Sequence, residues 1–126
     1  MAEIREGLEY TETHEWVKRE GKRARIGVTD YAQQNLTDVV YVDLPQAGKE
    51  IKKGEILASI ESVKSVSDVY SPASGKVVEV NSRLNDEPEL INKSPYDDGW
   101  LVVIELAEEP EGLIDAEAYK KITEQQ

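Results

Sequence analysis

Cysteine is absent from this chain of 126 residues, and histidine occurs once, at His14. The first absence excludes disulfides, thiolate nucleophiles and every metal site built on cysteine, so nothing indicates an oxidising compartment. A single histidine cannot form the clusters that zinc and iron sites use. No serine stands beside it in the sequence to suggest a nucleophilic triad. We therefore interpret His14 as a packing or surface residue at the entrance to a strand.

Positive charge is also scarce, since 15 Lys and Arg face 26 Asp and Glu and give a formal net charge of -11. A phosphate backbone is bound by clustered lysines and arginines that release its counterions. Nucleic acid is therefore excluded as a partner. The same acidity favours partner proteins with basic patches and helps to keep the chain soluble.

No apolar run approaches the roughly 20 residues that a membrane span needs. The first residues, MAEIREGLEYTETHEW, are charged and mixed, and they resemble neither a secretory signal nor a transit peptide. We expect a cytoplasmic chain with no membrane partner. The glycines are scattered rather than gathered in a phosphate-binding loop, and the acidic loop around Asp97 and Asp98 does not have EF-hand spacing. We expect no catalytic residue and no metal site.

Most of the chain alternates apolar and polar residues between short turn signals, which is typical of strands. In EILASIES this pattern places Ile56, Ala58 and Ile60 on one face, and WLVVIEL repeats it near the end of the chain. The length and the 39% hydrophobic content fit one compact domain over residues 1–126. The predicted fold is mainly β, an antiparallel sandwich or flattened barrel with short helices.

Two segments have the spacing of helices. TDYAQQNL begins with Thr29 as a predicted N-cap and places Ala32 and Leu36 on one face. IDAEAYKKITEQQ predicts a helix that closes the chain. Between the last strands, residues 84–99 hold two prolines, two asparagines and five carboxylates, which predicts an ordered surface loop.

Residues 54–75 predict one hairpin folded about Lys64, which stands at the centre of the run SVKSV. The flanking Val63 and Val66 are expected to anchor the turn while the ammonium group points outward. A lysine in this position is sterically accessible to a modifying enzyme, and acylation would remove its charge. An ordinary exposed lysine has the same local pattern, so the residues by themselves leave both interpretations open.

The run ESVKSVSDVYSPASGKVVEVN, residues 61–81, resembles the lipoyl-attachment region of the glycine cleavage system H-protein family. The segments THEWV, IGVTDYAQ, DVVYVDLP and ELINKSPYDDGWL also resemble family segments and stand in the family's order. The resemblance covers nearly the whole chain. It implies a lipoyl-domain-like hybrid barrel, with a lipoyl-binding core at residues 25–107.

The resemblance implies that Lys64 carries lipoate in amide linkage. It also implies that lipoylating enzymes read Glu61, Ser62 and Val63 together with the hairpin shape. Gly75 corresponds to the turn glycine that follows the attachment hairpin in the family.

Sheltering of the loaded arm is implied at three further positions. Glu15 is the stronger candidate for a polar contact with the aminomethyl group, and Thr13 is the weaker one. Asn35 stands where some members have a histidine that contacts the arm. Ser65 and Val66 depart from the two small residues that many members have after the lysine.

The resemblance further implies a carrier that is not itself an enzyme. Lipoate would accept the aminomethyl group at glycine decarboxylase, which uses pyridoxal phosphate, and deliver it at aminomethyltransferase, which uses tetrahydrofolate. Dihydrolipoamide dehydrogenase, with FAD and NAD, would then reoxidise the arm.

Several alternatives stay open at this point. A related carrier, such as the lipoyl domain of a 2-oxoacid dehydrogenase or a biotin carrier, also presents its modified lysine at the turn of a hairpin. A lipoyl relay protein that donates lipoate to other enzymes would have the same sequence features. A third alternative is an interaction domain in which Lys64 is never modified.

Overall fold

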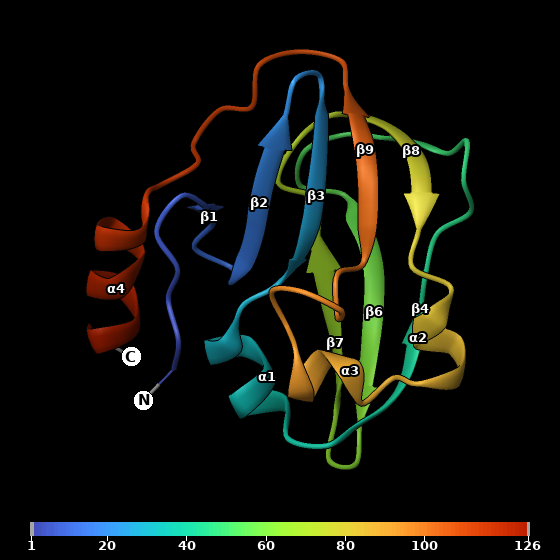
Figure 1. Cartoon of the computed structure of the whole chain (residues 1–126), viewed down its shortest axis with the longest axis vertical. Coiled ribbons are helices and arrows are strands. Elements are labelled where there is room, and N and C mark those ends of the chain that lie inside the picture. Colours follow the sequence, from blue (N-terminus) through green and yellow to red (C-terminus); the bar gives the residue numbers. More distant parts are fainter. Residues whose placement is uncertain (1, 126) are drawn as a thin grey trace.

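A computed structural model describes residues 2–125, which form two antiparallel sheets (Figure 1). The larger sheet has the strand order β1-β2-β3-β9-β8-β5, and the smaller one has the order β4-β6-β7. Four helices flank the sheets. The strands are β1 Glu9–Tyr10, β2 Glu15–Glu20, β3 Arg23–Val28, β4 Val39–Asp43, β5 Glu50–Ile51, β6 Ile56–Ser62, β7 Val66–Tyr70, β8 Gly75–Val80 and β9 Val102–Leu106, and the helices are α1 Asp30–Leu36, α2 Arg83–Asp86, α3 Leu90–Lys93 and α4 Ala116–Gln125.

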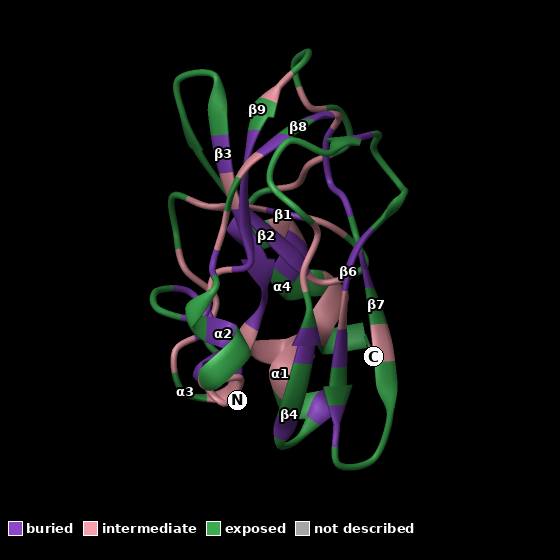
Figure 2. Ribbon diagram, turned by 90° about the vertical axis from the view of Figure 1, so that its right-hand side faces the viewer, coloured by how far each residue is buried: buried purple, intermediate pink, exposed green. Residues whose placement is uncertain are grey.

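One apolar cluster joins the two sheets. Ile26 and Ile104 of the larger sheet and Ile60 of the smaller sheet are fully buried in it. Figure 2 shows the same division, with buried segments on the strands of both sheets and exposed residues along β7 and its turn. This arrangement confirms the predicted mainly β fold. Within residues 2–125, no helix is long and apolar enough to cross a membrane.

The alternation predicted for β6 is wrong at its first residue. Ala58 and Ile60 are buried as expected, but Ile56 is 52% exposed. The pairing of β6 with β7 shifts register between Ile56 and Ala58, which makes Leu57 an extra residue in β6. A bulge of this kind reverses the side-chain alternation beyond it, so Leu57 is buried and Ile56 faces outward.

Gly75 is the first residue of β8 and pairs with Ile51 and Leu106. A Cβ atom at this position would lie 2.1 Å from the carbonyl oxygen of Glu105. The resemblance predicted a glycine in a turn, whereas the structure places Gly75 in a strand, where glycine lets the neighbouring backbone approach closely.

Replacing Gly75 by alanine is expected to destabilise the protein by about 3 kcal/mol, because one of the paired strands must shift to admit the methyl group. Urea unfolding of Gly75→Ala measures this loss. Lys76→Ala, at the exposed next residue of β8, is the control and should stay within about 0.5 kcal/mol of the wild type. Equal stability of the two variants would contradict the expected clash.

Helix α1 begins as predicted. The Thr29 hydroxyl accepts a hydrogen bond from the Ala32 backbone N–H at 3.2 Å and caps the helix. Leu36 is buried and Ala32 packs against the same core. The helix therefore holds one end of the apolar cluster beside the start of β2 (Figure 1).

The surface loop predicted for residues 84–99 is wrong in part, because the segment contains α3 and most of α2. Leu84, Leu90 and Ile91 are buried in the main core. Their burial stabilises two single turns of helix that have no side-chain cap. Local sequence preference did not predict these helices, because tertiary packing stabilises them.

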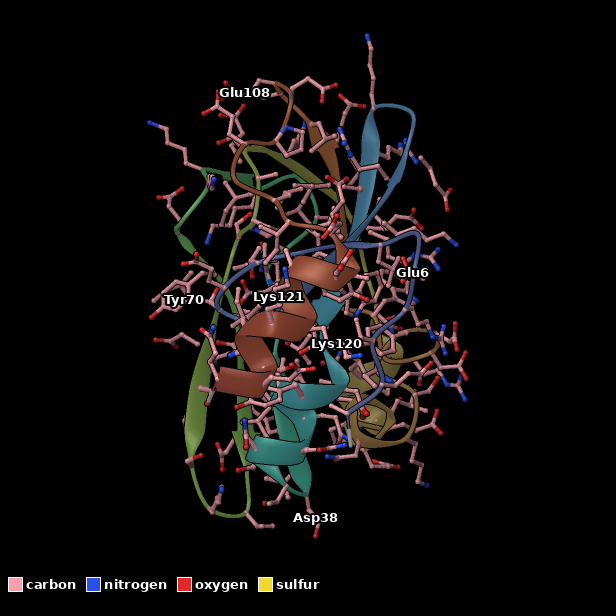
Figure 3. The ribbon with its side chains drawn as sticks, turned by 90° about the vertical axis from the view of Figure 1, so that its left-hand side faces the viewer. Glu6, Asp38, Tyr70, Glu108, Lys120 and Lys121 are labelled. Atoms are coloured by element: carbon pink, nitrogen blue, oxygen red, sulfur yellow. The ribbon has the colours of Figure 1, made fainter. Side chains whose placement is uncertain are left out.

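Helix α4 confirms the predicted closing helix and packs on a second, largely aromatic cluster. Tyr119 of α4 stacks on Tyr10 of β1, with ring centroids 4.6 Å apart and planes inclined by 8°. Trp16 of β2 is fully buried in the same cluster, and its indole N–H donates to the Pro95 carbonyl at 2.9 Å. Figure 3 shows α4 lying across the ends of the N-terminal strands and beside α1.

Candidate functional site

The turn between β6 and β7 presents Lys64. Three residues, 63–65, connect the strands, and the Ser62 hydroxyl organises them. This hydroxyl accepts hydrogen bonds from the backbone N–H groups of Lys64 and Ser65 at 3.3 and 3.2 Å. The Ser62 N–H donates to the Ser65 carbonyl at 2.8 Å and closes the turn. A side chain of the preceding strand thus holds Lys64 at the tip of the hairpin.

The side chains of the two valines on either side of Lys64 do not anchor the turn, contrary to the prediction. Val63 and Val66 are 66% and 65% exposed. The anchor is instead a backbone hydrogen bond of 3.0 Å from the Val63 N–H to the Asp38 carbonyl, in the segment that enters β4. Asp38 lies at the end of the molecule where the hairpin turns (Figure 3). The tip is therefore tied to the smaller sheet, and the Lys64 side chain is exposed.

A cavity of about 220 Å³ lies between the start of β2, α1 and the hairpin. It contains all three residues that the resemblance implies in arm sheltering, namely Thr13, Glu15 and Asn35. Ser65, next to Lys64, also lines it, so the cavity reaches the turn that presents the lysine. Its apolar lining comes from Val28, Leu36, Ile60 and Val69.

Glu15 is the most deeply buried carboxylate of this cavity, at 2% exposure. Burial raises the pKa of its carboxyl above the usual value, although hydrogen bonds from Thr13 and Thr11 oppose the shift. The two threonine hydroxyls donate to the same oxygen, Oε1, at 2.5 and 2.7 Å. A fixed acceptor therefore faces a small, mainly apolar space.

Substituting Glu15 by glutamine is expected to weaken the decline of stability at rising pH. The raised pKa means that the folded protein binds more protons than the unfolded chain in the pH range above the usual glutamate pKa. The free energy of unfolding therefore falls as pH rises through that range. Glutamine keeps an acceptor oxygen for the threonines but cannot ionise. Urea unfolding from pH 5 to pH 8 should show a flatter profile and higher stability at neutral pH for Glu15→Gln, and parallel profiles would contradict this.

His14 is a site residue that sequence reasoning did not identify. It lines the cavity, and its backbone is in the left-handed region with φ 71°. Its ring packs against Tyr31 of α1 in a tilted arrangement with centroids 4.7 Å apart, and Nδ1 lies 2.7 Å from the Tyr119 hydroxyl. The same hydroxyl is 2.7 Å from the Thr29 hydroxyl. Of the two predicted interpretations, packing or surface residue, the ring contacts favour packing. The link between α4 and the cavity depends on tertiary contacts that no local pattern indicates.

The remaining predicted residues divide into two places. Glu61 is exposed on β6, three residues before Lys64, Ser62 is the buried last residue of β6, and Val63 is the first residue of the turn. Gly75 begins β8, and this strand starts at the end of the molecule away from the turn between β6 and β7 (Figure 1), so Gly75 does not contribute to the surface around the lysine.

Asp97 lies in the acidic loop that lacks EF-hand spacing, and its carboxylate is paired with a cationic side chain of the same chain. Both of its carboxylate oxygens accept hydrogen bonds from the Arg5 guanidinium at 2.9 Å. This contact holds the pKa of Asp97 below its usual value. Among residues 2–125, no group of three or more histidine, cysteine, aspartate or glutamate side chains has a geometry that could hold a metal ion.

Comparison with known proteins gives a consistent result. Residues 8–126 match the family model described as Glycine cleavage H-protein. A glycine cleavage system H protein of Thermotoga maritima is 56% identical over 119 residues, which is 93% of this chain and 96% of that protein. One from Rubrobacter xylanophilus is 49% identical over the full length of both. A solved structure of an H protein from Mycobacterium marinum has a TM-score of 0.91 at 35% identity and covers 96% of this chain and 99% of that one.

Proposed function

The chain belongs to the glycine cleavage H-protein family, the lipoyl carriers of the glycine cleavage system, and from this premise we propose that Lys64 is its lipoyl-attachment residue. The observation that carries the proposal is the turn itself, which holds an exposed primary amine at the tip of a hairpin and next to a cavity. The lipoyl-bearing core is assigned to residues 25–107. The segment that supplies Thr13 and Glu15 lies outside that core.

The residues around Lys64 fit a lipoyl arm. Bound lipoate supplies a disulfide that accepts the aminomethyl group of glycine and is later reoxidised. The chain itself supplies a rigid base, since the Ser62 hydroxyl and the Val63 backbone hold the turn in place. Glu61 and Val63 are exposed and form the surface that a lipoylating enzyme meets first, whereas the buried Ser62 contributes by shaping the turn.

The cavity is the proposed shelter for the loaded arm. Its apolar walls would exclude water from the aminomethyl group, and the Glu15 carboxyl would accept a hydrogen bond from the amine. Thr13 and Asn35 line the same space. A site that combines apolar walls with several polar side chains suits an arm that must be held briefly and then released.

In this proposal the chain catalyses no step alone. It carries the aminomethyl group from glycine decarboxylase, with its pyridoxal phosphate, to aminomethyltransferase, with its tetrahydrofolate, and dihydrolipoamide dehydrogenase restores the arm with FAD and NAD. Tethering raises the effective concentration of the arm at each active site. A net charge of -11 suits brief docking, because charge complementarity raises association rates more than it prolongs binding.

The intact mass after incubation with lipoate, ATP and a lipoate ligase tests the attachment, followed by exchange of bicarbonate with glycine by glycine decarboxylase. We expect one lipoyl increment and exchange that depends on it. An unmodified, folded chain beside a modified reference acceptor would refute the carrier proposal and favour an interaction domain. Lipoylation without exchange, but with transfer of lipoate to an apo-acceptor, would favour the relay alternative.

A further inference from the structure

The exposed apolar side chains of residues 2–125 are concentrated on one part of the molecule. Every large hydrophobic side chain that is exposed in the described chain belongs to the smaller sheet or to its turn. The larger sheet, with twice as many strands, has none. These residues are Val40 and Tyr41 of β4, Ile56 of β6, Val63 of the turn, and Val66 and Tyr70 of β7.

The strand register places most of these side chains on the face that points away from the core. Tyr41 pairs with Glu61 and Glu61 pairs with Val66, so these three form a row across the sheet next to the Lys64 turn. All three are exposed, while the next pair on β4 and β6, Val42 and Ile60, is buried. We call the side that carries Tyr41, Glu61 and Val66 the outer face.

The outer face continues along the sheet. Asp43, Ser59 and Asp68 form the next outward row, two residues farther along each strand. Ile56 and Tyr70 form a pair beyond it, because the bulge at Leu57 turns Ile56 outward. Tyr70 projects away from the ribbon in Figure 3. The outer face is therefore mainly apolar at both ends, apart from Glu61, and acidic in the middle.

Its charge has a single sign. The three strands contain Asp43, Glu61 and Asp68 but no lysine or arginine. The larger sheet exposes both signs, for example Lys76 and Glu105 as a cross-strand pair. Like charges repel, so a second copy of this acidic face or an anionic membrane is a poor partner. A protein surface with lysine or arginine between two apolar areas complements it.

We propose that the outer face is the docking surface for enzymes that receive the Lys64 arm, and that these enzymes present apolar areas with lysine or arginine between them; the inference rests on the proposed carrier function. Glu61 and Val66 are three and two residues from Lys64, so an active site that takes up the arm also meets this end of the face. Exposed tyrosines surrounded by charge are typical of side chains that dominate the energy of an interface.

The experiment compares lipoylated wild-type carrier with the double variant Tyr41→Ser, Asp43→Lys. Both residues are exposed on β4, and neither lines the cavity. The assays are bicarbonate–glycine exchange by glycine decarboxylase and turnover by dihydrolipoamide dehydrogenase. We expect KM for the carrier to rise about tenfold, with kcat unchanged, in at least the exchange assay. The reason is that the double variant weakens docking but leaves the chemical step intact. Added salt should raise KM of the wild type more than KM of the variant.

Two controls make the comparison specific. Glu79→Lys changes the net charge by the same amount on the larger sheet, at an exposed residue of β8, and should change KM by less than about twofold. Tyr41→Phe keeps the apolar ring and should behave like the wild type. A similar rise of KM in Glu79→Lys would show a general charge effect and would overturn the proposal.

Failure of the docking proposal is distinguishable from failure of the carrier proposal. A wild-type chain that accepts no lipoate overturns both. Lipoylation with exchange, but with equal KM for wild type and double variant, overturns docking alone. If the wild type is lipoylated but supports no exchange, wild type and double variant are compared by their KM in the lipoate ligase reaction. Equal KM values in that reaction again overturn docking. A wild-type dimer in sedimentation that the double variant abolishes would assign the face to self-association and overturn it as well.

Discussion

Replacing Lys64 by arginine is expected to abolish lipoylation completely and to reduce glycine-dependent exchange to the level of the unlipoylated protein. Arginine keeps the positive charge and a long side chain at the turn, but its guanidinium is not an amine that a lipoylating enzyme can acylate. The turn is held by the Ser62 hydroxyl and the backbone of the neighbouring residues, so the fold should not change. Intact mass and the exchange assay measure the loss, and urea unfolding verifies the fold.

The matched control is Lys93→Arg, at an exposed position in the last turn of α3. This variant should accept one lipoyl group and support exchange like the wild type. A lipoyl increment on Lys64→Arg would show that another lysine is the attachment site. Loss of modification in both variants would indicate that the ligase reads overall lysine content rather than the hairpin.

Replacing Tyr119 by alanine is expected to cost about 4 kcal/mol of stability, as is typical of removing a buried aromatic side chain. Tyr119 is fully buried, stacks on Tyr10 and bonds with its hydroxyl to His14 and Thr29. Its removal leaves a cavity and releases α4 from the strands. Urea unfolding measures the loss, with the exposed Lys121→Ala of the same helix as control, for which a change within about 0.5 kcal/mol is expected.

Tyr119→Phe separates the ring from the hydroxyl. It keeps the stacking on Tyr10 but leaves the side chains of His14 and Thr29 without this partner, for which about 1–3 kcal/mol is expected. Equal stability of Tyr119→Phe and wild type would mean that the hydroxyl network contributes nothing. Equal losses in Tyr119→Phe and Tyr119→Ala would mean that the ring contributes nothing.

The sequence predicted the structure correctly wherever a local pattern is compatible with only one type of secondary structure. Alternation predicted the strands, Thr29 predicted the start of α1, and the run around Lys64 predicted the hairpin, all of which the structure confirms. These features depend on backbone period and on capping groups that lie within a few residues of one another. The prediction of an attachment site came from the resemblance, since a lysine at a turn has no chemistry that distinguishes it from other exposed lysines.

Prediction failed where distant contacts decided the outcome. Ile56 was predicted to share a face with Ala58 and Ile60, but a bulge that depends on pairing with β7 turns it outward. Leu90 and Ile91 were assigned to a surface loop, but their burial under the sheets makes that segment helical. A register shift changes the local backbone energy little. The register that forms is the one that buries the apolar side chains of each face.

The amino-acid sequence alone determined the strand-rich architecture, the exclusion of cysteine chemistry, the acidic character and the position of Lys64 at a turn, because these follow from composition and short-range periodicity. Only the tertiary structure decided that Thr13, Glu15 and Asn35 meet in one cavity beside that turn, that His14 links it to α4, and that the exposed apolar residues share one sheet. Such groupings join residues that are far apart in sequence. They exist only because two sheets and four helices bury a common core, and packing rather than local preference sets which side chains remain together at its edge.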